Sequence, residues 1–312
     1  VHIGEISAAS FNDTIPAKEV WRVSEDGELR DPFKKLTTVF QMSEEIFFLH
    51  YGKDGCNRHV LIDECRELFG EIYEQIPELP FCNIWTAMQL SSRLPKGALF
   101  HMGVSNTRRC WNMFQLPESV ESACNVGCCG IDGCVSTLVG ASLVNPDRLC
   151  YVVVGDLTFF YDLNSLGNHH IGTNLRVMLV NNGRGTEFRL GIHHCNVFGD
   201  DADKYMAAAG HFGNKSPLLV KHYAEDLGFH YLSATTKEEF MTALSNFTNP
   251  QLSDHSMILE VFTDSKDESE ALYLMSHIQS DAKGMVRSKL KDAVRNVAGE
   301  KGINAIKKIL KK

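Results

Sequence analysis

The chain has 312 residues, of which 44% are apolar and 22% charged, proportions typical of a soluble globular protein. Its formal net charge of −8 argues against nucleic acid as the main partner. No apolar run approaches the roughly 20 residues of a membrane span, and residues 1–5 lack the basic segment of a signal peptide. We therefore expect a cytoplasmic protein with no membrane span.

Residues 1–80 are expected to contain few strands. Residues 1–4 and 19–24 have strand-like patterns, 39–50 fit either a strand or a helix, and 56–76 have helical spacing. So few strands would give this part of the chain a thin core. The chain also starts with valine rather than methionine. We interpret residues 1–80 as the remainder of a truncated central domain whose beginning is missing.

Residues 81–265 alternate between helical and strand-like patterns, which is typical of a parallel sheet. The expected helices are residues 81–94 (amphipathic), 134–143, 157–170, 220–227 and 237–247. The expected strands are residues 99–104, 149–154, 175–180, 229–233 and 256–262. The order predicts a doubly wound, mostly parallel α/β sheet with helices on both faces. The His-rich stretch 190–213 is expected to form a loop with a short helix across the site.

Residues 266–312 are expected to form a helical C-terminal extension, with Lys or Arg frequent after residue 282. The apolar residues near its end fall on one stripe: Ile303, Ile306, Ile309 and Leu310. A basic amphipathic helix of this kind either touches a membrane surface or lies on its own protein. Both interpretations stay open.

The ten cysteines lack the paired Cys-x-x-Cys spacing of a zinc site. The cluster from Cys124 to Cys134 leaves a metal site open as one interpretation. The alternative is that these are small apolar residues near a turn, in a reducing compartment.

Two successive apolar strands end in polar residues, the first in Gly155-Asp156 and the second in Asn181-Asn182. Open α/β sheets bind ligands at the carboxyl ends of their strands. Carboxylate, amide and backbone carbonyl oxygens suit Mg²⁺ shared with phosphate, and the helix after Asp156 would direct N–H groups at an anion. The alternative is an ordinary strand–helix–strand unit, in which Asp156 caps the helix and the asparagines form a turn.

Gly-Asp followed at this distance by Asn-Asn resembles the cofactor motif of thiamine diphosphate enzymes. The resemblance implies that Asp156, Asn182 and the backbone of Arg184 hold Mg²⁺, which holds the diphosphate of the cofactor. Gly155 and Leu157, on either side of Asp156, belong to the same cofactor-binding motif.

A second motif narrows the resemblance to one branch of that superfamily. Residues 125–137, which include Gly130-Ile131-Asp132-Gly133, and residues 155–164 are similar to motifs of the 2-succinyl-5-enolpyruvyl-6-hydroxy-3-cyclohexene-1-carboxylate synthase family, of menaquinone biosynthesis. The resemblance covers residues 80–265 and implies a thiamine diphosphate-binding fold for them.

This resemblance implies a transferase, a carboligase that decarboxylates 2-oxoglutarate and adds the succinyl unit to isochorismate. Ile131 should support the bent form of the cofactor, and Phe188 should pack near its rings. Ser105 and Arg109 fall where the family has a Ser and an Arg that bind a substrate carboxylate, a task that suits the arginine fork. The alternative for Arg109 is a surface ion pair.

The chain departs from the family pattern at Val126, where the family has an arginine. Without this arginine, one binding partner for a substrate carboxylate is missing, so the identity of the acceptor substrate stays open. One alternative is a thiamine diphosphate-dependent decarboxylase or carboligase of another pathway, such as surface polysaccharide synthesis. Another is a non-catalytic module that binds the cofactor.

Family catalysis also needs a glutamate from a pyrimidine-binding domain, which no part of this chain resembles. We therefore assign no catalytic residue to this chain. We expect that domain as a partner, on the same longer chain or on a second subunit, and a small 2-oxoacid as substrate. We expect the complete enzyme to be a homodimer or homotetramer, and this chain alone to be inactive.

Overall fold

The computed structural model describes residues 1–4, 17–52, 60–127, 129–190, 193–206 and 210–278. Packing divides the chain into two units, Val1–Gly70 and Glu71–Lys312. Helix α2 (Val60–Glu74) contains the point of division. The domain limits expected after residues 80 and 265 remain predictions. Within the described ranges, no helix combines the length and apolarity needed to cross a bilayer.

The first unit contains a parallel sheet with the strand order β1-β2-β3. The strands are His2–Ile3, Val20–Val23 and Leu36–Phe40. The ambiguous stretch 39–50 holds both the end of β3 and most of helix α1 (Glu44–Tyr51), which is capped by the Ser43 side chain. Four aromatic rings join α1 to the sheet: Trp21, Phe40, Phe47 and Tyr51.

The second unit contains a six-stranded sheet in the order β5-β4-β6-β7-β9-β8, in which every neighbouring pair is parallel. The strands are β4 (Leu99–Met102), β5 (Glu121–Cys124), β6 (Cys150–Gly155), β7 (Leu175–Asn181), β8 (His230–Ala234) and β9 (Met257–Phe262). The helices are α3 (Asn83–Leu90), α4 (Asn106–Trp111), α5 (Cys134–Val144), α6 (Asp156–Asp162), α7 (Ala202–Tyr205), α8 (Leu219–Asp226), α9 (Lys237–Phe247) and α10 (Ser265–Met275). The predicted α/β class is confirmed.

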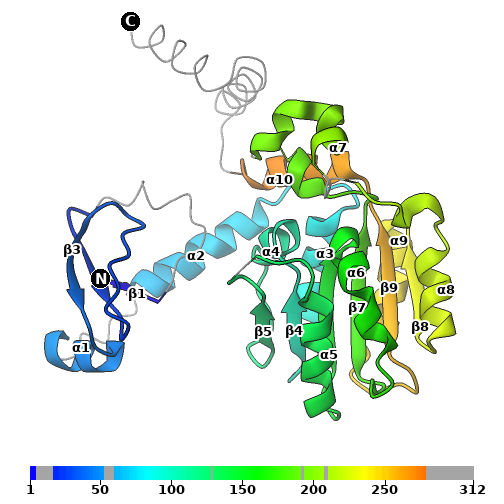
Figure 1. The fold of residues 1–312 in the computed structure, drawn as a ribbon, viewed down its shortest axis with the longest axis horizontal. Coiled ribbons are helices and arrows are strands. Elements are labelled where there is room, and N and C mark those ends of the chain that lie inside the picture. The colour runs from blue at the N-terminus through cyan, green and yellow to red at the C-terminus, as the bar shows by residue number, and fades with distance from the viewer. Residues whose placement is uncertain (5–16, 53–59, 128, 191–192, 207–209, 279–312) are drawn as a thin grey trace, which may run out of the picture. The chain divides into compact units, whose positions relative to one another are not determined.

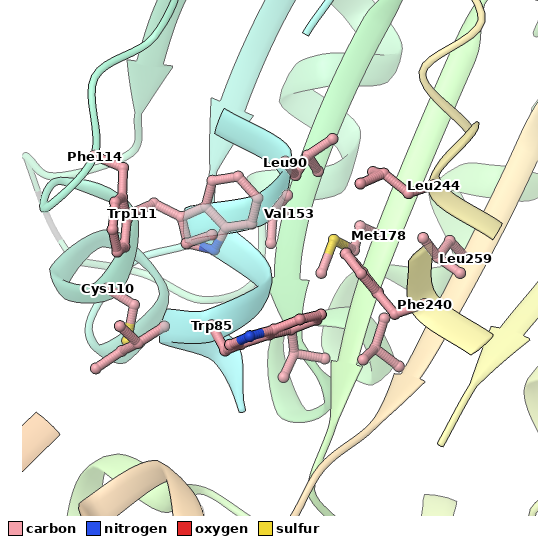
Figure 2. Packing of buried hydrophobic residues seen from close by; sticks show 14 of the residues in the cluster. Trp85, Leu90, Cys110, Trp111, Phe114, Val153, Met178, Phe240, Leu244 and Leu259 are labelled. Carbon is pink, nitrogen blue, oxygen red and sulfur yellow. The ribbon is translucent and has the colours of Figure 1, made fainter. Parts of the chain in front are cut away.

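Helices cover both faces of this sheet (Figure 1). One core cluster joins the strands to α3, α4, α9 and α10, and the other joins them to α5, α6 and α8. Successive side chains of a strand alternate between the two clusters, so that Tyr151 and Val153 enter the first while Val152 and Val154 enter the second. Figure 2 shows the first cluster, with Trp85 among its buried side chains.

Two predicted helices differ from those in the structure. The helix expected at 81–94 is not amphipathic: six of the eight residues of α3 are buried, because the sheet covers one side and α10 packs on another. The helix expected at 157–170 ends at Asp162 and continues only as a 3₁₀ segment to residue 167. The Asp162 carboxylate accepts a hydrogen bond from the Ser136 backbone of α5, which fixes α6 at this point.

Candidate functional site

A pocket opens at the carboxyl edge of the six-stranded sheet, where the strand order reverses. From β4 the chain first adds β5 on one side, and it then returns to add β6 on the other side. Such a reversal is where open α/β sheets bind ligands. The residues that line the pocket are Asn83, Val104–Thr107, Ile131, Gly155–Thr158, Val180, Asn182 and Arg184–Phe188. All the predicted site residues are among them except Arg109, which contacts the lining residue Glu187.

Asp156 is the buried first residue of α6, directly after β6. Its Oδ1 accepts a hydrogen bond of 2.8 Å from the backbone of Leu157, so this expected anion-binding N–H is already used. Its Oδ2 lies 2.9 Å from His211 Nε2. Since His211 Nδ1 accepts from the Gly213 backbone, the ring proton of neutral His211 is on Nε2 and is donated to Asp156.

The Asn-Asn turn is held from outside the pocket. Asn181 Nδ2 donates to Glu260 Oε1 on β9 at 2.7 Å, and Tyr231 donates to the other oxygen of Glu260. Burial raises the pKa of Glu260. Gly183 has a φ of +80°, a conformation that glycine adopts without steric cost and that turns the chain after Asn182.

The oxygens gathered at this turn fit a hard cation. The Asp156 carboxylate, the Asn182 side chain and the Arg184 residue all line the pocket. Mg²⁺ is typically bound through one or two carboxylates together with substrate phosphates, so a single protein carboxylate is sufficient. Thr186 also lines the pocket, and its hydroxyl is buried without a hydrogen-bond partner. A buried orphan hydroxyl in a pocket indicates a polar ligand.

The cysteine cluster gives no metal site in the described part of the chain. Among those residues, no group of three or more His, Cys, Asp or Glu side chains is arranged to hold a metal ion. Cys134 is buried in the core, and Cys128 lies outside the described residues.

Apolar side chains form another wall of the pocket. Ile131 follows β5 and packs on the core beneath it. Phe188 lies in the 3₁₀ turn after β7, and the centroid of its ring is 5.3 Å from that of His193. His193 and His211 belong to the stretch 190–213, of which residues 191–192 and 207–209 are not described. The predicted loop with a short helix is present there, as a 3₁₀ segment followed by α7.

Ser105 and Arg109 lie at the start and in the body of α4. Ser105 has a φ of +58°, a conformation that is uncommon for a residue with a side chain and is found where a site is under strain. Arg109 donates two hydrogen bonds, of 2.8 and 2.9 Å, to the two carboxylate oxygens of Glu187. These bonds raise the pKa of Arg109. Glu187 could not be recognised from the sequence, because only the fold brings it to Arg109.

A buried carboxylate supports α3 beside the pocket. Both oxygens of Glu268 on α10 accept from the Asn83 backbone, and Thr263 donates to one of them. The Asn83 side chain lines the pocket and accepts from the Trp111 indole of α4. Burial raises the pKa of Glu268 to about 7. Asn83 therefore ties both α10 and α4 to the pocket wall.

Relatives of this chain share one name. The chain is 34% identical to the 2-succinyl-5-enolpyruvyl-6-hydroxy-3-cyclohexene-1-carboxylate synthase of Bacteroides fragilis over 82% of its own length, which covers 45% of that protein. This chain is a homologue of these synthases. The protein of that name from Phocaeicola vulgatus is 32% identical over 82% of the chain and 44% of its own length. The one from Flavobacterium psychrophilum is 30% identical over 77% and 42%, respectively.

The resemblance predicted from the two motifs is therefore confirmed. The chain spans less than half the length of the relatives it matches. No family model matches it.

Proposed function

We propose that the pocket binds thiamine diphosphate through Mg²⁺, as part of a transferase with the activity of the synthases that the chain resembles. One observation carries the proposal: Asp156, Asn182 and Arg184 line a single pocket where the strand order reverses. The homology to a thiamine diphosphate-dependent family supports the choice of cofactor. The orphan hydroxyl of Thr186 supports a polar ligand in the same pocket.

The pocket then has two ends. At the diphosphate end, which comprises Asp156, Asn182 and the Arg184 backbone, the protein oxygens would hold Mg²⁺ on the diphosphate. Gly155 and Leu157 flank this end on the β6–α6 turn. At the substrate end, which comprises Ser105, Arg109 and Glu187, polar side chains would meet the substrate. Ile131 and Phe188 would contact the aromatic rings of the cofactor between the two ends.

Thiamine diphosphate, when bound, supplies the electron sink needed to break and form bonds at the carbonyl carbon of a 2-oxoacid. The residues of this chain would bind the cofactor and orient it. Asp156 is held by His211, and the Asn-Asn turn is held by Glu260. Side chains that are already held by hydrogen bonds lose less conformational freedom when they bind a metal. Such hydrogen bonds therefore increase the affinity for the metal.

The properties of the complete enzyme follow from the resemblance. We infer a partner domain that binds the pyrimidine ring and carries the catalytic glutamate, on the same chain or on another subunit. We also infer 2-oxoglutarate and isochorismate as substrates, a homodimer or homotetramer, and a cytoplasmic location. Because this chain carries no residue assigned to activate the cofactor, we expect it to be inactive when separated from that domain.

A second candidate is a related carboligase or decarboxylase with another substrate. Two observations favour it. Val126 replaces an arginine of the family motif, and the fork of Arg109 is already occupied by Glu187. Both changes remove positive charge that a carboxylate substrate would use.

Calorimetric titration tests the binding step directly. Thiamine diphosphate should bind to the protein with Mg²⁺ present and bind more weakly with EDTA present, because the metal links the diphosphate to the protein oxygens. Thiamine without the diphosphate is the matched control and should bind weakly in both buffers. Equal binding of the two compounds would reject the diphosphate end. Decarboxylation of 2-oxoglutarate, assayed with the pyrimidine-binding domain present, then tests the first substrate.

A further inference from the structure

We propose that residues 210–214 position the expected metal ligands, and that they thereby adapt the diphosphate end to Mg²⁺ rather than to a larger cation. His211 acts as a positioning residue for Asp156. Asn214 acts in the same way on the turn that carries Asn182. The inference rests on the proposed function, because it takes the diphosphate end to bind a metal ion.

The first contact joins this segment to α6. His211 Nε2 lies 2.9 Å from Asp156 Oδ2, and the side chains of these two residues are 9% and 3% exposed. The His211 ring also packs on Phe160, which lies one helical turn after Asp156 on the same side of α6, with the ring centroids 5.0 Å apart. A Cβ atom at Gly213 would collide with the Phe160 ring, so a glycine there lets the segment lie close to the helix. The hydrogen bond to Asp156 is therefore shielded from water, and packing fixes its direction.

The second contact joins the segment to the Asn-Asn turn. Gly210 forms an isolated antiparallel bridge with Arg184. Asn214 Nδ2 donates a hydrogen bond of 3.3 Å to the carbonyl oxygen of Gly183, the residue that follows Asn182. One short segment is therefore attached to both turns that carry the expected metal ligands, and it restrains the distance between them.

These contacts leave acceptor sites for a cation. Among the described residues, Asp156 accepts from the Leu157 backbone and from His211, which uses two of the about four lone-pair sites of a carboxylate. In the same part of the chain, the side-chain oxygen of Asn182 accepts from the Arg184 backbone at 3.4 Å, and an amide oxygen has a second lone pair. The segment therefore orients both ligands without occupying all of their lone pairs.

A restrained site suits Mg²⁺ better than Ca²⁺. Mg²⁺ requires near-octahedral geometry with oxygens at about 2.0–2.1 Å, whereas Ca²⁺ accepts about six to eight oxygens at about 2.3–2.6 Å in flexible arrangements. Residues that hold the ligands of a metal typically contribute about 10-fold to 100-fold to its affinity. Loss of the contacts made by residues 210–214 should therefore weaken the binding of Mg²⁺ more than that of Ca²⁺.

The test measures the affinity of the protein for thiamine diphosphate by calorimetry, once with Mg²⁺ and once with Ca²⁺ as the metal. His211→Ala removes the donor to Asp156, and should weaken Mg²⁺-supported binding about tenfold or more. Ca²⁺-supported binding should fall less than about threefold, because Ca²⁺ tolerates a looser site. His211→Gln keeps a side-chain N–H donor of similar reach, and should restore most of the Mg²⁺-supported affinity.

Asn214→Ala should act in the same direction, but only by about twofold to threefold, because its hydrogen bond is long and exposed. If His211→Ala fails to fold, as judged by circular dichroism, the comparison of Asn214→Ala with the wild type decides the question. Lys215→Ala is the matched control, because Lys215 directly follows the segment and its ammonium lies 3.8 Å from the centroid of the exposed Phe212 ring. It should leave both affinities unchanged.

An unchanged Mg²⁺-supported affinity in His211→Ala would overturn the inference. Equal losses with the two metals would also overturn it, because they would make the segment merely structural, and so would a His211→Gln variant as weak as His211→Ala. If the wild-type protein binds thiamine diphosphate with neither metal, the proposed function fails and this inference fails with it. Metal-dependent binding by the wild type, together with unaffected variants, would reject only this inference.

Discussion

The two ends of the pocket are built in different ways. At the diphosphate end, Asp156 is 2% exposed and is hydrogen-bonded to His211 of a distant segment. Asn181, which precedes Asn182, is 7% exposed and is hydrogen-bonded to Glu260 of another distant segment. At the substrate end, two partly exposed charges satisfy each other. The first end is fixed by the core around it, whereas the second depends on one residue of a turn. A substitution at the substrate end can therefore change which ligand binds there without disturbing the diphosphate end.

The largest expected effect is the change of protein stability with pH caused by Glu268, which supports the wall beside the substrate end. Burial raises its pKa from 4.5 to about 7, so between these values the folded protein binds a proton that the unfolded chain has released. Stability contributed by this group should therefore fall as the pH rises through this window. The shift corresponds to roughly 3 kcal/mol. Urea unfolding at pH 5 and pH 8 measures it.

Glu268→Gln is the control for that measurement, because glutamine does not ionise. The difference in unfolding free energy between pH 5 and pH 8 should be smaller in the variant than in the wild type. Parallel pH profiles of the two proteins would mean that Glu268 titrates normally and that the wall does not depend on a buried carboxyl group.

The next effect concerns the diphosphate end. Asp156→Ala removes the carboxylate from the expected metal site, and should weaken Mg²⁺-dependent binding of thiamine diphosphate at least tenfold, about 1.4 kcal/mol. Calorimetry on the variant and the wild type measures the change. Asn182→Ala should act in the same direction. Unchanged affinity in the Asp156 variant would remove this residue from the metal site.

A smaller effect is expected from Thr186, whose hydroxyl is buried without a partner. Thr186→Val should stabilise the free protein by about 1 kcal/mol, since an unsatisfied buried hydroxyl costs roughly 1–3 kcal/mol. The same change should reduce the rise in melting temperature caused by Mg²⁺ and thiamine diphosphate. Thr186→Ser, which keeps the hydroxyl, should keep that rise. If Thr186→Val stabilises the free protein but does not reduce the rise in melting temperature, contact between the Thr186 hydroxyl and the ligand is excluded.

The smallest effect is expected from Arg109. Arg109→Ala should raise the apparent KM for the 2-oxoacid or the acceptor and leave cofactor affinity alone. The increase should stay below about tenfold, because Glu187 already neutralises the guanidinium. Steady-state kinetics with the complete enzyme and calorimetry with the cofactor measure the two quantities. A loss of cofactor affinity with an unchanged KM would make Arg109 a structural residue.

Much of the second unit could be predicted from the sequence. Strands such as β6 and β7 are continuous apolar runs because they are buried on both faces, and their polar ends mark the site. Strand β5 was not predicted, because its residues 121–124 form no apolar run and are largely exposed at an edge of the sheet. Its pairing with β4 depends on the fold rather than on a local pattern.

The site was predictable where a residue follows a strand, as Asp156 and Asn182 do. It was not predictable where two distant side chains meet. His211, Glu187 and Glu260 lie 55, 78 and 79 positions from the partners they hold. No spacing rule in a single sequence connects such pairs, although the His-rich stretch 190–213 correctly indicated a loop near the site. The basic stretch expected after residue 282 and its apolar stripe lie outside the described residues.

The position of β9 between β7 and β8 has a consequence for synthesis of the chain. Because Glu260 follows Asn181 by 79 residues, the Asn-Asn turn leaves the ribosome well before the carboxylate that holds it. At roughly 5–20 residues per second, that delay is on the order of 4–16 s. A nascent chain therefore has β6 and β7 available for pairing while the future cofactor turn still lacks its support. The pocket is completed only when the last strand of this sheet is inserted.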